Sequence, residues 1–154
     1  MIRMTKQTDY GIVLLSRMAS RPERMFNAGE LAAETRLPPP TVSKILKILG
    51  REGLLDSHRG VKGGYTLARA PHSITVTEII TALEGPIGIT ECIDDTPGEC
   101  SHEARCPVRG NWHRINEAIR RALDEINLAE MAQPMTEPLV HLGGGMALEN
   151  AELG

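Results

Sequence analysis

Three consecutive prolines at positions 38–40 interrupt a helical sequence pattern and limit what the first third of this 154-residue chain can fold into. Proline cannot continue a helix, but it suits the first turn of a new one. A short helix is predicted over 28–35, before the prolines, and an amphipathic helix begins at Pro40 or Thr41 and stops at Gly53. Two helices joined by so short a turn are typical of the helix-turn-helix, whose second helix enters the DNA major groove.

A glycine-rich hairpin is predicted directly after this helix pair. Strands over 54–58 and 65–68 flank a tip with the sequence RGVKGG, in which glycine lets the backbone turn tightly. Arg59 and Lys62 can reach phosphate groups from such a tip, which makes the hairpin a wing. With a first helix predicted over 8–19, these elements give a winged helix-turn-helix, so the fold class is mainly α with a small β wing.

Charge is divided unequally along the chain. Residues 1–69 hold 12 of the 17 Lys and Arg and 6 of the 20 acidic residues, a net charge of +6, whereas residues 70–154 carry a net charge of −9. A basic half on an acidic protein indicates a module that faces phosphate, so double-stranded promoter DNA is the expected partner. Aromatic residues make up only 3%, too few for a stacked RNA-binding platform. The predicted DNA contacts are Pro40, Thr41, Ser43, Lys44, Lys47, Arg59 and Lys62.

The only cysteines, Cys92, Cys100 and Cys106, lie close together in a polar stretch that has neither helical nor strand periodicity. An odd number cannot form a complete disulfide framework, and cysteines in a polar loop are unlike those of a core. Thiolates favour soft metals, which points to zinc or an iron-sulfur cluster. The spacing C-x7-C-x5-C lacks the C-x2-C pair typical of structural zinc sites. A redox thiol switch without a metal is the alternative. A metal site would need a fourth ligand in addition to the three thiolates.

An apolar stripe follows the cysteines. Its members recur by threes and fours and are Trp112, Ile115, Ile119, Ala122, Ile126 and Ala129. Such a stripe predicts a long helix that packs either on its own domain or on a second subunit. A homodimer would present two wings and two recognition helices to a two-fold operator.

The chain therefore divides into a winged helix-turn-helix domain over 1–84, a cysteine-rich loop over 85–111, a dimerisation helix over 112–133, and a tail over 134–154 that we expect to be disordered. No apolar run approaches the roughly 18 residues of a membrane span, and the first residues lack a secretory apolar region, so we expect a cytoplasmic protein without a membrane partner. No nucleophile and base arrangement indicates an enzyme.

Several motifs together resemble the Rrf2 family of bacterial winged-helix transcription regulators over about residues 1–133. They are MTKQTDY at 4–10, RGVKGGY at 59–65, TEII at 77–80, LEG at 83–85, and the three cysteines before a long helix. The resemblance implies that the cysteines hold an iron-sulfur cluster, with [2Fe-2S] favoured over [4Fe-4S], and that the long helix dimerises. It also implies that cluster state sets DNA affinity. The chain looks most like the branch that controls the SUF iron-sulfur assembly genes, so we expect it to repress those genes.

Two departures from the family pattern concern the cluster ligands. Cys92 and Cys100 are separated by seven residues where the familiar pattern has five, and Arg109 stands where one branch has a cluster-completing histidine. Another branch uses an acidic residue near the N-terminus of the partner subunit, and Asp9 matches it. The resemblance thus favours Asp9 of the partner subunit as fourth ligand over His102 or His113. The alternatives are a zinc-binding or thiol-switch regulator, or an iron-sulfur assembly factor that does not bind DNA.

Overall fold

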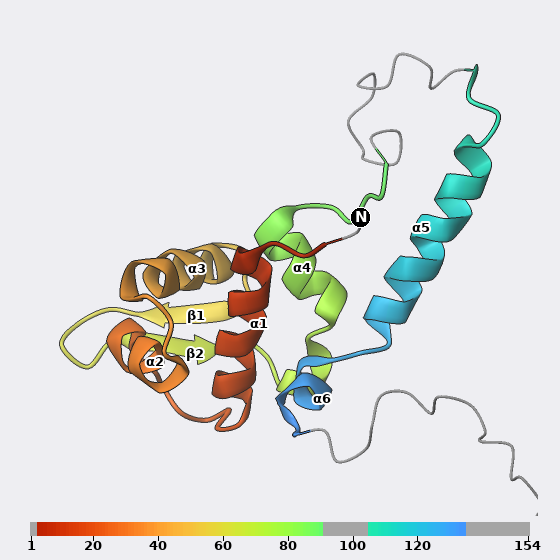
Figure 1. Ribbon diagram of the computed structural model, residues 1–154. Helices are drawn as coiled ribbons and strands as arrows, with labels where there is room; N and C mark the ends of the chain where they lie inside the picture. The colour runs from red at the N-terminus through yellow and green to blue at the C-terminus, as the bar shows by residue number, and fades with distance from the viewer. Residues whose placement is uncertain (1–2, 91–104, 135–154) are drawn as a thin grey trace, which may run out of the picture.

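Helices alternate with one β hairpin in the computed structural model, which describes residues 3–90 and 105–134 (Figure 1). The elements in chain order are α1 (Lys6–Ala19), α2 (Ala28–Thr35), α3 (Pro39–Arg51), β1 (Leu55–His58), β2 (Gly64–Leu67), the 3-10 turn η1 (Pro71–Ser73), α4 (Val76–Glu84), α5 (Arg109–Asp124) and α6 (Leu128–Ala132). This architecture confirms the mainly α class with a small β wing. Nearly all of the predicted tail lies outside the described residues. In the part described, no helix combines the length and apolarity that crossing a membrane requires.

The turn of the helix-turn-helix is built from one left-handed residue and the prolines. Arg36 caps the end of α2 with φ of 57°, and Pro38 then stands at the N-cap of α3 in an extended conformation. Proline occupies the first positions of α3, where its missing N–H costs nothing. The helix pair therefore forms as predicted: α2 has the predicted bounds, whereas α3 begins one residue before Pro40 and ends at Arg51, two residues before Gly53.

The core fills the space between α1, α2, α3, the base of the wing and α4. Its large side chains with less than 2% exposure are Phe26, Leu14, Leu15, Met18, Leu31, Ile45, Leu46, Leu49, Leu55, Ile74, Ile79 and Leu128. Every helix of the first half contributes to this one cluster. The position of α3 is consequently fixed by packing on three sides, which makes it a rigid platform for its exposed face.

The wing is an antiparallel hairpin, and an isolated β-bridge between Tyr65 and Phe26 ties it to the segment before α2. Leu55 pairs with Leu67 at its base and His58 with Gly64 near its tip. Tyr65 also exchanges two backbone hydrogen bonds with Phe26, with N···O distances of 3.0 and 2.7 Å. A Cβ at Gly64 would meet the carbonyl group of Phe26, so glycine is required there by close backbone approach.

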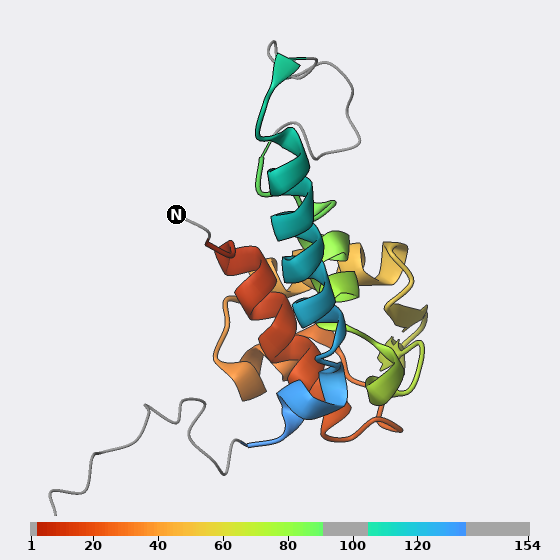
Figure 2. The ribbon, with the colours of Figure 1, turned by 90° about the vertical axis from the view of Figure 1, so that its right-hand side faces the viewer.

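The helix predicted over 112–133 is in fact two helices. α5 ends at Asp124 and α6 begins at Leu128. Between them Asn127 forms a bridge with Thr75, and Leu128 N donates to Ile74 O at 2.8 Å. Asn127 then starts α6 with a capping box. The apolar pattern continues across this break, but α6 packs against α1 as part of the first domain (Figure 2).

Candidate functional site

One face of α3 is buried and the opposite face carries the residues predicted to contact DNA. Val42, Ile45, Leu46 and Leu49 point into the core. Pro40, Lys44 and Lys47 are exposed, while Thr41 and Ser43 are partly exposed. The N-terminal end of α3 thus presents small polar and basic side chains on a rigid helix, as a recognition helix requires.

The N-terminal end of α1 widens this surface. A hollow of about 420 Å³ lies between the two helices. It is lined by Lys6, Gln7, Tyr10, Pro40, Thr41 and Lys44. Our sequence interpretation did not include Lys6 or Tyr10 among the contacts, although both belong to the MTKQTDY motif. Their position adds a cation and a phenol to the edge of the recognition helix.

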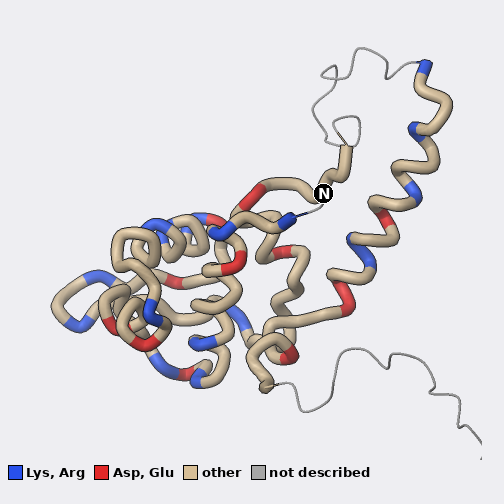
Figure 3. Tube along the Cα trace, viewed as in Figure 1, with Lys and Arg blue, Asp and Glu red and all other residues tan. Residues whose placement is uncertain are grey.

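The charges of this surface differ from those elsewhere. Lys and Arg of α3 and of the wing lie on one side of the molecule (Figure 3). Arg59 and Lys62 are exposed at the wing tip, where Gly60 turns the chain with φ of 109°. Three arginines away from this surface are paired with glutamates. The pairs are Arg17 with Glu34, Arg24 with Glu30, and Arg69 with Glu78. The wing and α3 therefore offer cations that phosphate can neutralise.

Of the three cysteines predicted to hold a cluster, Cys106 is the one that lies within the described residues. It is an unpaired and partly exposed thiol, and its carbonyl oxygen accepts from Arg109 N at 3.4 Å in the turn that leads into α5. Cys92, Cys100 and His102 lie outside the described residues. Within 3–90 and 105–134, no group of three His, Cys, Asp or Glu is placed to hold a metal ion.

The remaining predicted ligands lie on two different helices. Asp9 is exposed in the first turn of α1, next to the buried Thr8. His113 is exposed on α5, one turn beyond its start. The structure thus leaves both side chains accessible to a second subunit or to the cysteine segment.

The chain that leads from α4 toward Cys92 is attached on two sides. Glu84, the last residue of α4, accepts hydrogen bonds from Thr5 N and Thr5 Oγ1, both at 2.9 Å, and from Thr8 Oγ1. Three residues later, Ile87 O accepts from Asn116 Nδ2 of α5 at 3.0 Å. The segment is therefore tied both to the start of α1 and to the middle of α5.

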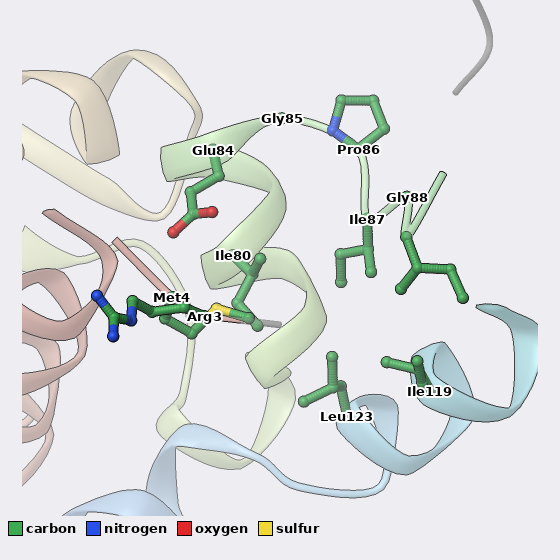
Figure 4. A pocket seen from close by; sticks show the side chains of 11 residues that line it. Arg3, Met4, Ile80, Glu84, Gly85, Pro86, Ile87, Gly88, Ile119 and Leu123 are labelled. Atoms are coloured by element: carbon green, nitrogen blue, oxygen red, sulfur yellow. The ribbon is translucent and has the colours of Figure 1, made fainter. Parts of the chain in front are cut away.

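A cavity of about 520 Å³, lined by both apolar and charged side chains, lies beside these attachments (Figure 4). Its main lining residues are Arg3, Met4, Ile80, Ile87, Ile119 and Leu123. Ile119 and Leu123 thus lie on the side of α5 nearest the first domain. In contrast, Trp112 and Ile115 are 38% and 45% exposed. The apolar stripe therefore has one member on α5, Ile119, that faces the first domain, and an outward part formed by Trp112 and Ile115.

Comparison with known proteins identifies relatives that are transcriptional regulators. A family model described as "Rrf2: Iron-dependent Transcriptional regulator" matches residues 4–134. The HTH-type transcriptional regulator NsrR of Geobacillus kaustophilus is 30% identical over 133 residues, covering 86% of this chain and 90% of that protein.

Two solved structures are similar over most of their length. One is CymR (YrzC), described as the global cysteine regulator of B. subtilis, with 28% identity and a TM-score of 0.65, covering 86% of this chain and 97% of that one. The other is T. potens IscR, with 27% identity and a TM-score of 0.62, covering 84% of this chain and 85% of that one.

Proposed function

The chain belongs to the Rrf2 family of transcriptional regulators, and from this premise we propose that it is an iron-sulfur cluster-sensing repressor of SUF iron-sulfur assembly genes. Family membership makes it a regulator of transcription and not an enzyme. The observation that carries the sensing role is the position of Cys106, a free and partly exposed thiol at the start of the helix that follows the DNA-binding domain. A cytoplasmic site of action follows from the task of binding promoter DNA.

DNA recognition is assigned to α3 and the wing. Lys44 at the start of α3 and the two wing cations supply positive charge for the phosphate backbone. Pro40, Thr41 and Ser43 stand at the N-terminal end of α3, which is the part of a recognition helix that reaches base edges. Lys47, one turn further along, is assigned to the backbone.

Replacing Arg59 by alanine should weaken binding to promoter DNA and reduce the slope of log K against log salt by about one, because one phosphate contact is lost. Titrations by fluorescence anisotropy at several salt concentrations measure both quantities. Arg21→Ala is the matched control, since Arg21 is an exposed arginine just beyond the C-terminal end of α1. An equal change in slope for both variants would contradict a wing contact.

The cofactor is assigned to Cys92, Cys100 and Cys106, with Asp9 of the partner subunit as the fourth ligand. Cysteine thiolates are the usual ligands of iron-sulfur clusters, and we propose [2Fe-2S] rather than [4Fe-4S]. When bound, the cluster would be the group that responds to the signal, which is the availability of iron, oxygen or nitric oxide. Asp9 is exposed on α1, so its carboxylate is free to bind the cluster of the other subunit.

A thiol-switch regulator is the second candidate. It is favoured by the likeness to a structure described as the oxidized form of Staphylococcus aureus CymR, and by a free, partly exposed Cys106 thiol. Both candidates place the sensor in the same segment. They differ in whether the purified protein contains iron.

Anaerobically purified protein should be coloured and should contain iron and sulfide, and Cys106→Ala should lose most of its visible absorption because a thiolate ligand is removed. Asp9→Ala should keep its colour but shift the spectrum, whereas His113→Ala should match the wild type. Ultraviolet-visible and Mössbauer spectra with metal analysis check these results. Colourless protein after reconstitution would leave the thiol switch, and stoichiometric zinc would leave a zinc regulator.

A further inference from the structure

We propose that Glu84 is a positioning residue that couples the state of the cysteine segment to the DNA-reading helices. The proposal rests on the proposed function, because it assumes that the cysteines sense a signal and that α3 reads DNA. Glu84 is separated from Cys92 by seven residues of sequence, and it bonds to the opposite end of the DNA-binding domain's sequence.

The Glu84 carboxylate, at the end of α4, accepts the hydrogen bonds of the residues that begin α1. Thr5, the N-cap of α1, uses its side chain to accept from Thr8 N at 3.3 Å and to donate to Glu84 Oε1 at 2.9 Å. The hydroxyl of Thr8, which is fully buried, donates to the same oxygen. A carboxylate at this place also faces the positive end of the helix dipole. The conformation of the first turn of α1 therefore depends on where Glu84 stands.

Charge makes this attachment stronger than a neutral one. Burial would raise the pKa of Glu84, but the hydrogen bonds from Thr8 and Thr5 outweigh burial and hold the pKa below its usual value. Glu84 is thus an anion near neutral pH. Hydrogen bonds to an ionised acceptor are roughly twice as strong as those between neutral groups.

A second hydrogen bond and a close contact extend the attachment along α1. Gln7 Nε2 donates to Leu83 O at 3.0 Å. One turn further, Gly11 leaves no space for a Cβ beside the Leu83 side chain, and the same position lies 3.6 Å from Ile45 of α3. α1, α3 and the end of α4 consequently meet at one point. Because packed interiors transmit displacement, a shift at residues 83–84 reaches the recognition helix through Gly11.

The other side of the segment is held by α5. Asn116 is 3% exposed and is the buried residue of that helix, and its amide donates to Ile87 O. α5 begins three residues after Cys106. The stretch 84–87 is therefore bonded on one side to α5, which follows Cys106, and on the other to α1, which packs against α3. This is the arrangement that a link between sensor and reader needs.

The test compares the dissociation constants of cluster-loaded and chelator-stripped full-length protein for a duplex selected by the wild type from random DNA. Allosteric couplings are typically about 5- to 150-fold, so Glu84→Ala should reduce the wild-type ratio by at least about fivefold. Glu84→Gln keeps a neutral acceptor and should give an intermediate ratio. Hydrogen exchange of the amides of residues 5–9 should quicken in the same order.

Glu78→Ala is the matched control, because Glu78 is a hydrogen-bonded glutamate at the other end of α4. It should lower stability but leave the ratio unchanged. Thr8→Val should reduce the ratio and Thr8→Ser should restore it, which tests the same bond without touching Glu84.

The outcomes separate the two proposals. A large wild-type ratio that persists in Glu84→Ala and Thr8→Val would overturn the coupling role alone. A wild-type ratio of one would overturn the sensing function and, with it, the coupling. A ratio lowered equally by Glu78→Ala would show a general loss of stability and overturn the specific role of Glu84.

Discussion

Replacing Leu128 by alanine is expected to lower the free energy of unfolding by about 2.7–5 kcal/mol, which is the range for a leucine removed from a well-packed core. Leu128 is 0% exposed and joins the core cluster from α6. Its amide also donates to Ile74 O, so the side chain and the backbone fix the same junction. Urea unfolding followed by circular dichroism measures the change.

Met131→Ala is the control for this prediction. Met131 lies on the same short helix but is 40% exposed, and substitutions at such positions usually change stability by at most about 0.5 kcal/mol. If Leu128→Ala were no more destabilising than Met131→Ala, α6 would not be an integral part of the domain.

Replacing Ile115 by aspartate tests the homodimer that the sequence predicts: with the interface on the outward part of the apolar stripe, the variant should be monomeric, and its affinity for a two-fold operator should fall to that of a single half-site. Ile115 belongs to the outward part of the apolar stripe, and an unpaired carboxylate buried there would be costly. Loss of the second recognition helix removes half of the DNA contacts. Sedimentation velocity and DNA titration measure the two effects.

Ile115 separates dimerisation from folding better than Ile119 does. Ile119 lines the cavity next to Ile87, so a charge at Ile119 would also disturb the packing of α5 on its own domain. His113→Asp places the same charge on the opposite side of α5 and should leave the dimer intact. A dimeric Ile115→Asp protein would assign the interface to another surface.

Elements with local sequence signals could be predicted with little error. The turn before α3 follows from three prolines, and α2 occupies the predicted range 28–35 because capping and apolar periodicity agree there. The sequence offers Thr75 or Thr77 as the cap of the helix that ends before Gly85, and in the structure Thr75 caps α4. In each case the determinant lies within a few residues of the element that it forms.

Features set by distant contacts could not be predicted in the same way. The break after Asp124 depends on the bridge between Asn127 and Thr75, while the apolar period continues through it. The capping box of Asn127 with Glu130 was the local signal available for α6. The bond between Thr8 and Glu84 joins residues 76 positions apart, and no periodicity in one sequence records such a pair.

The attachments at Glu84 and Ile87, together with the start of α5 after Cys106, bear on how this chain tolerates insertions. Residues before and after positions 91–104 are held on the same domain, and for a flexible loop with fixed ends each doubling of length costs about 0.6 kcal/mol of closure entropy. The two additional residues between Cys92 and Cys100, relative to the family pattern, cost only a fraction of that. A change of spacing among the cysteines would therefore leave the exposed face of α3 and the wing, where we predict the DNA contacts, in place.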